Sequence, residues 1–118
     1  MKLTNADVFQ SREPMQRLMT ERLPVKTAYG LAKIESKLKE QFQIVDSVRN
    51  GLINKYGEKD EHDRVQVKQD SPNWEKFVAE FNELLEQEVE LVVEKVKLPE
   101  TLEIDSNTLL LLGKLVYV

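Results

Sequence analysis

The residues whose types and spacing could do chemistry lie in "YGEKDEHDRVQV", residues 56 to 67. His62 is the only histidine of the chain, and four carboxylates surround it: Glu58, Asp60, Glu61 and Asp63. Carboxylates and an imidazole in one short stretch are the donors of a calcium loop, a zinc site or an acid–base pair. Each of these sites needs its own spacing, so each can be tested on the sequence.

The spacing fits none of the three. A calcium loop that began at Asp60 would need an oxygen ligand where His62 stands and a glycine where Val65 stands. Zinc needs three or four ligands, and the chain has one histidine and no cysteine. An acid–base pair needs a pocket and a group that orients the imidazole, which neighbours on a loop do not supply. The stretch is therefore interpreted as an exposed connector between a helix and a strand.

No other stretch contains a reaction centre. A Ser-His-Asp set is not readable, because the lone histidine sits in this charged loop. The four glycines are isolated from one another, so no phosphate-binding loop exists. We therefore expect a protein that is not an enzyme and that uses no cofactor and no metal.

The composition predicts one globular domain spanning residues 1–118, with 41% hydrophobic and 32% charged residues. Residues 1–56 carry 10 Lys and Arg against 6 Asp and Glu, whereas residues 57–118 carry 7 against 15. The basic half could face nucleic acid, or the two halves could attract each other. The second interpretation is favoured, because no aromatic residues alternate with the basic ones as stacking partners. We expect no nucleic-acid partner.

A membrane partner is not expected either. The N-terminus has no apolar segment of the kind found in signal peptides. The longest apolar run, "TLLLLGKLVYV", has about half of the roughly 20 residues that a membrane span needs, and it contains Lys114.

The hydrophobic periodicity of the first half predicts a helical hairpin over residues 1–56. A first helix is capped by Thr4 or Asn5, with a kink or short break expected at Pro14. The strongest helix runs from residue 25 to about 56, with Gly57 as its stop. At 1.5 Å per residue such a helix measures roughly 45 Å, longer than a small core, so part of it is expected to project or to pair with another chain.

The second half, residues 57–118, is predicted to follow the order strand, helix, strand, helix. "RVQVK" alternates as a strand does, and a helix follows that is capped by Asp70 or Ser71 with Pro72 in its first position. "EVELVVEKVKL" is the best strand, with a bulge or end at Lys95, and a short helix ends near Gly113. The fold class predicted is α+β and mostly helical, with a long helix packed against shorter helices. The two strands form a small antiparallel sheet.

The C-terminal "LLLLGKLVYV", residues 109–118, allows two interpretations. In one, Leu109 fills the core of the domain together with Leu112, Leu115 and Val116. In the other, the remainder of this apolar end contacts an oligomeric copy or another protein, since an apolar chain end is unusual unless it is docked. The candidate partner-binding residues are Leu111, Leu112, Leu115, Val116, Tyr117 and Val118.

Four strings together resemble a known family: "MKLTN", "LPVKTAYGLAKIESKL", "LINKYGEKDE" and "FNELLEQEVELVVEKVKL". They are similar to strings of small uncharacterised proteins of tailed bacteriophages and prophages, a domain of unknown function. The likeness covers most of the chain in the same order. Members often continue "EKDE" with an Asn-Gly turn where this chain has His62-Asp63. They also end in a more charged helix than "GKLVYV", which leaves the boundary of the last helix open.

The resemblance implies a tailed-phage setting, in the bacterial host cytoplasm or in the virion, and implies no activity or catalytic residue. Joined with the absence of a reaction centre, it favours a non-enzymatic bacteriophage protein that acts through protein–protein contacts with a phage or host protein. The first hypothesis is a virion-assembly or head–tail accessory protein, and a homo-oligomer is one expectation. The alternative is a phage antagonist that binds and inhibits a host defence or replication factor.

Overall fold

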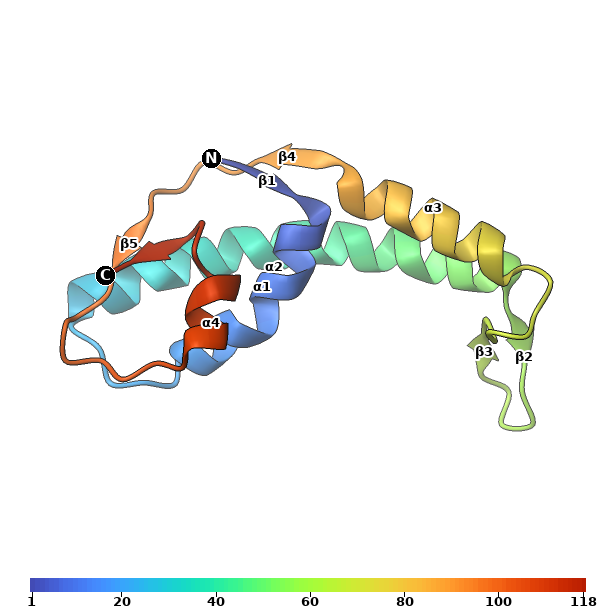
Figure 1. The fold of residues 1–118 in the computed structure, drawn as a ribbon, viewed down its shortest axis with the longest axis horizontal. Helices are drawn as coiled ribbons and strands as arrows, with labels where there is room; N and C mark the ends of the chain where they lie inside the picture. The colour runs from blue at the N-terminus through green and yellow to red at the C-terminus, as the bar shows by residue number, and fades with distance from the viewer.

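The computed structural model describes all residues from 1 to 118 and shows a mostly helical α+β fold (Figure 1). The helices are α1 (Asn5–Leu18), α2 (Val25–Tyr56), α3 (Trp74–Glu86) and α4 (Ser106–Leu111). The strands are β1 (Lys2–Thr4), β2 (Glu58–Lys59), β3 (Val65–Gln66), β4 (Glu88–Glu90), β5 (Val96–Lys97) and β6 (Val116–Tyr117). No helix is both long and apolar enough to cross a membrane.

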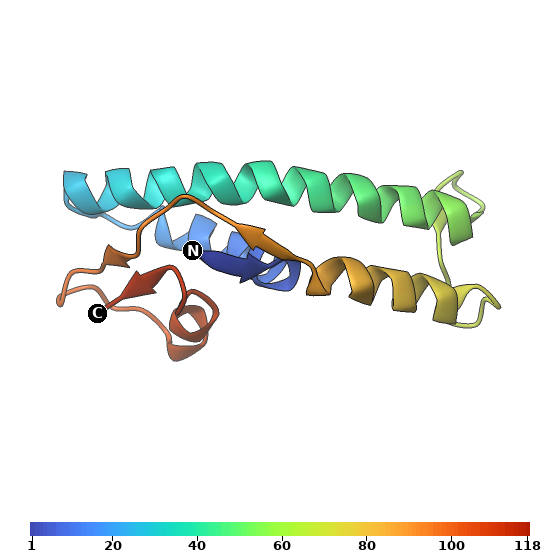
Figure 2. The ribbon, with the colours of Figure 1, turned by 90° about the horizontal axis from the view of Figure 1, so that it is seen from above.

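The molecule has a head and an arm, arranged along α2 in an elongated shape 50 Å long (Figures 1 and 2). We call residues 44–86 the arm, which comprises the second half of α2, the β2–β3 hairpin and α3. The head comprises residues 1–43 and 87–118, and both chain ends lie in it (Figure 1). The long helix thus does project beyond the core, as its length predicts.

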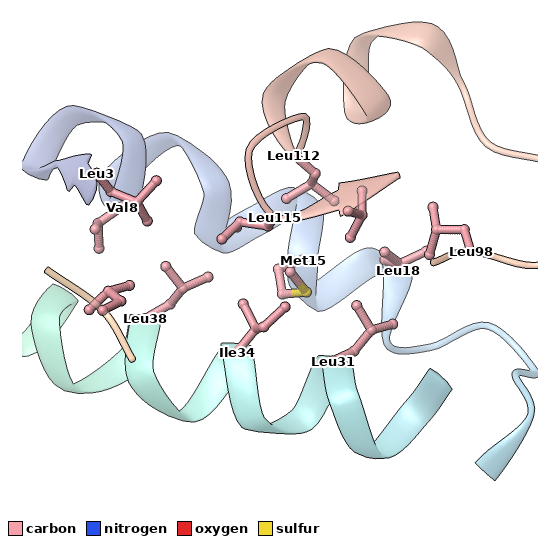
Figure 3. Packing of buried hydrophobic residues seen from close by; sticks show 12 residues of the cluster. Leu3, Val8, Met15, Leu18, Leu31, Ile34, Leu38, Leu98, Leu112 and Leu115 are labelled. Carbon is pink, nitrogen blue, oxygen red and sulfur yellow. The ribbon is translucent and has the colours of Figure 1, made fainter. Parts of the chain in front are cut away.

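The hydrophobic core lies entirely in the head. Its central members Met15, Ile34 and Leu112 come from α1, α2 and the C-terminal segment, and they meet in Figure 3. The core cluster consists of Leu3, Val8, Met15, Leu18, Leu31, Ile34, Leu38, Leu91, Leu98, Leu112, Leu115 and Val116. In the arm only Val45 is fully buried. Two helices side by side cover only one stripe of each other, so the apolar residues of the arm stay half exposed.

The predicted bounds of α2 are confirmed, and α1 differs from its prediction at one point. Thr4 caps α1 as expected: its hydroxyl accepts a hydrogen bond from the Asp7 amide, and the Asp7 carboxylate accepts one from the Thr4 amide. Of the kink or short break predicted at Pro14, the break is absent, because α1 continues through it to Leu18. Pro14 and Met15 are both buried, and this packing holds the helix together where one backbone hydrogen bond is missing.

Gly57 ends α2 as predicted, but for another reason than a left-handed cap. Its backbone is extended, at φ −85° and ψ 165°. A Cβ at this position would collide with the Ile53 carbonyl oxygen and would lie 2.8 Å from a Val65 methyl group. The glycine is therefore required because the β2–β3 hairpin passes close to the end of the helix.

The pairing of the strands corrects the predicted sheet. The two predicted strands do not pair with each other: β3 pairs with β2 in an antiparallel hairpin, and β4 pairs with β1 with Leu3 opposite Val89. The expected long strand over residues 88–98 is divided, since only its two ends are strands. Its second end, β5, pairs in parallel with β6. We call the segment 90–100, which links these two pairs, the strap.

Helix α3 begins later than predicted, whereas α4 ends near Gly113 as predicted. Helix α3 begins at Trp74, and the Ser71 hydroxyl accepts a hydrogen bond from the Asn73 amide in the turn before it, so Pro72 lies outside the helix. Helix α4 ends at Leu111, before Gly113. The last residues are then free to leave the helix and to form β6 beside β5.

Candidate interaction surface

The charged stretch around His62 is the tip of the β2–β3 hairpin. The Asp60 carboxylate accepts hydrogen bonds from the backbone amides of His62 at 2.8 Å and of Arg64 at 2.9 Å. Asp63 adopts a left-handed backbone with φ 60°, which aspartate tolerates in turns. The Asp60 carboxylate thus closes the turn. The interpretation as a connector between a helix and a strand is confirmed, although the connector itself supplies the short strand β2.

The structure contains no group of three or more His, Cys, Asp or Glu side chains that could hold a metal ion. The sequence predicts contacts with another protein, so surfaces on which another molecule could dock are the candidate functional sites, beginning with the C-terminal residues.

The structure divides the six candidate partner-binding residues into two groups. Leu112, Leu115 and Val116 are at most 2% exposed and belong to the core, so their prediction as partner contacts is wrong. Pairing of β6 with β5 turns Val116 inward, and the preceding turn brings Leu112 and Leu115 onto α1 and α2 (Figure 3). Leu111 is half buried, whereas Tyr117 and Val118 are exposed by 47% and 68%. The first interpretation holds for most of this segment, with Leu109 partly buried against the core.

The C-terminal segment is fixed to the head by polar contacts. The Val96 amide donates to the Leu115 carbonyl at 3.0 Å, and the Leu98 amide donates to the Tyr117 carbonyl at 2.8 Å. The Lys95 ammonium donates to the Gly113 carbonyl at 3.2 Å. Tyr117 is therefore held in one place, and its exposed ring borders an open hollow of the molecule.

This hollow, which we call the head groove, lies between the first half of α2 and the strap, where the orange chain approaches α2 in Figure 2. It is open and has a volume of about 1670 Å³. Tyr29 of α2, Val92 of the strap and Tyr117 line it, and their exposed fractions are 63%, 88% and 47%. Pockets for small molecules usually have about 300–1,000 Å³ and enclose their ligand. The size and openness of the head groove fit a segment of another protein better.

Lysines dominate the charge of the head groove. Five of them line it, against three glutamates: Lys26, Lys33, Lys37, Lys95 and Lys97, with Glu90, Glu94 and Glu100. The Lys33 ammonium lies 4.6 Å from the centre of the Tyr29 ring, a cation–π contact. The N-terminal amine donates to the Glu90 carboxylate at 2.8 Å, and this hydrogen bond lowers the pKa of Glu90. The free charge of the groove is therefore positive.

The middle of the strap has a backbone without partners. Residues 92–95 lie between two strands, and none of their amides or carbonyls shares a hydrogen bond with another backbone group of the chain. An extended backbone with unpaired groups is an edge to which another chain can add as a strand. The head groove thus offers aromatic rings, positive charge and an unpaired backbone segment, residues 92–95, side by side.

The sequence did not reveal this surface. Tyr29, which lines the groove, is exposed on α2. The groove joins residues about 60 positions apart, and nothing in a local pattern indicates that they meet. The exposed Val92 within a divided strand is the one signal that could have drawn attention to it.

Comparison of this chain with models of protein families, with curated proteins and with solved structures finds no match in any of the three.

Proposed function

We propose that this chain is a non-enzymatic bacteriophage protein that acts through protein–protein contacts at the head groove, as a virion-assembly or head–tail accessory protein. The phage setting rests on the resemblance of four sequence strings, which span most of the chain. It places the protein in the bacterial host cytoplasm or in the virion. Neither nucleic acid nor a membrane is a partner in this proposal.

The proposed mode of action rests on the position of the strap beside α2. Its unpaired backbone at residues 92–95 lies next to the exposed rings of Tyr29 and Tyr117 in an open groove with an excess of lysines. An extended segment of a partner could add to the strap through backbone hydrogen bonds and place apolar side chains against the two rings. Acidic residues in that segment would complement the lysines.

Capture of partners from infected cells tests this proposal. Because both chain ends lie in the head, the affinity tag belongs in the hairpin tip, between Glu61 and His62, which are exposed. We expect the tagged protein to retain one phage protein, and Val92→Lys to lose it. Glu13→Lys is the matched control, because the Glu13 side chain is 83% exposed on α1, outside the groove. Equal capture by the two variants would contradict a role for the groove.

The identity of the captured protein separates the two roles. A portal, capsid or tail protein supports the assembly role, and mass spectrometry of purified virions then distinguishes a virion component from a chaperone. A host defence or replication factor, lost from Val92→Lys, supports the alternative of a phage antagonist. Small acidic proteins suit that alternative, and the net charge here is −4.

A further inference from the structure

A second exposed apolar surface lies on the flank of α2, and the head groove does not include it. Ile44 and Val48 are exposed by 57% and 44%, and they line a shallow hollow of about 420 Å³. Glu40, Gln43 and Ser47 form the rest of its wall. In a helix, residues three and four positions apart share one face. We call this face, which continues to Gly51 and Lys55, the α2 flank; in Figure 2, α2 forms one long edge of the molecule.

Gly51 on this flank has no role within the single chain. It lies inside a regular helix, where glycine weakens the helix relative to alanine. Its φ is not positive, and a Cβ built on it would meet no atom within 4 Å. The other use of glycine is to let another backbone approach closely. At an exposed position, that backbone would have to come from outside the chain.

We propose that a second copy of this chain packs on the α2 flank, antiparallel, with the two-fold axis between Ser47 and Val48. In a two-fold interface each residue meets its counterpart reciprocally. This axis places Ile44 opposite Gly51 of the partner subunit, so the large isoleucine side chain faces a glycine, which has no side chain. It also places Glu40 opposite Lys55 of the partner subunit, twice in each dimer. Within one chain the Lys55 ammonium lies 3.6 Å from the Glu80 carboxylate of α3, and this exposed ion pair would be exchanged for the one across the dimer.

The charges along α2 favour an antiparallel copy over a parallel one. The first half of the helix carries four exposed lysines: Lys26, Lys33, Lys37 and Lys39. Beyond its other end, the hairpin tip carries four acidic residues: Glu58, Asp60, Glu61 and Asp63. Antiparallel packing directs the basic end of each copy toward the acidic end of the other, whereas parallel packing brings like charges together. This self-complementarity identifies a second copy as the occupant. Because Lys26, Lys33 and Lys37 also line the head groove, the second copy and the groove partner would share these lysines.

Charge reversal tests the proposed pairing. An interface made by one pair of helices buries little surface area compared with most protein interfaces. We therefore expect sedimentation velocity to give a dissociation constant of the dimer on the order of 10 µM. Glu40→Lys and Lys55→Glu should each weaken the dimer by about tenfold or more, because each creates two like-charge pairs. An equimolar mixture of the two variants should dimerise again, since the lysine introduced in one chain then faces the glutamate introduced in the other. Failure of the mixture to exceed either variant alone would overturn the proposal.

A substitution at Gly51 provides a second, independent test of the proposed dimer. Gly51→Leu should abolish the dimer while circular dichroism shows an unchanged helical fold, because nothing in the monomer lies near the new side chain. Asn50→Leu is the matched control: it lies on the same helix and is exposed, and because it is one residue from Gly51 and two from Val48 it faces another side of the helix. A wild-type chain that stays monomeric up to about 1 mM, or a dimer that tolerates Gly51→Leu, would each overturn the proposal. If no flank variant changed dimerisation, the two copies would meet at another surface, and this result would also overturn the proposal.

Discussion

The Lys114 ammonium lies 2.7 Å from the Asp7 carboxylate, and this ion pair ties the end of the chain to the first turn of α1. Partial burial of Asp7 disfavours its charged form, but hydrogen bonds from Lys114 and Thr4 outweigh it and lower the pKa of Asp7 below its ordinary value of 3.8. The same carboxylate completes the cap of α1. One side chain therefore links helix capping with docking of the C-terminal segment.

The lowered pKa of Asp7 predicts a pH-dependent contribution to stability. The contribution is present above the ordinary pKa of an unfolded aspartate and is lost as the pH falls through the folded pKa. At pH 7, Lys114→Met should lower the free energy of unfolding by about 0.5 kcal/mol, because Lys114 is 62% exposed and screened by solvent. The difference from wild type in urea titrations should close as the pH falls below the lowered pKa of Asp7. Lys68→Met is the control without an ion pair, and a difference that persists in acid would contradict this origin.

The two glycines of the arm, Gly51 inside α2 and Gly57 at its C-terminal end, predict opposite effects for one substitution. Gly51→Ala should raise the free energy of unfolding by about 1 kcal/mol, because alanine is the better helix residue and the space is open. Gly57→Ala should lower it by about 1–3 kcal/mol, because its Cβ collides with the Ile53 carbonyl and Val65. Urea titrations at low protein concentration measure both. Equal signs would contradict the packing of the β2–β3 hairpin on α2.

The four leucines at the C-terminal end provide a matched pair of truncations. Leu112 is fully buried, whereas Leu110 is 80% exposed. Leu112→Ala should cost about 2–5 kcal/mol of unfolding free energy, and Leu110→Ala should stay within about 0.5 kcal/mol. Thermal unfolding followed by circular dichroism checks both. Similar melting temperatures for the two variants would show that this end is not docked in the core.

The docked C-terminal segment also predicts the effect of shortening the chain. Truncation after Gly113 removes Leu115 and Val116 from the core and removes the partner strand of β5. We expect loss of the cooperative thermal transition of the head, and not a folded protein that lacks only a contact site. A folded truncated chain with an unchanged melting temperature would contradict the position of these residues.

The periodic parts of the sequence predicted the fold best. The apolar steps of α2 predicted both of its ends, and the Thr4 cap predicted the start of α1, because these signals act within one or two turns. The strand pairs escaped prediction for the opposite reason. Leu3 pairs with Val89 across most of the length of the chain, and β1 has only three residues, too few for any periodicity.

The candidate surfaces were predictable only in part. The apolar C-terminal end was recognised as docked or partner-binding, but β6 decides which residues face inward, and its partner β5 lies 20 residues earlier. The head groove depends on the distant meeting of Tyr29, Val92 and Tyr117, which no local pattern encodes. The length of α2 was the one sequence feature that correctly indicated a projecting arm.

Site-specific photo-cross-linking in infected cells tests most directly whether the protein acts through the head groove. A photoreactive residue at Val92, which is 88% exposed, samples the groove without disturbing the core, and one at Glu13 samples the outer face of α1. The proposed function predicts one discrete adduct with another protein from Val92 and none from Glu13. Equal adducts from both positions, or no adduct from Val92 at any stage of infection, would contradict it.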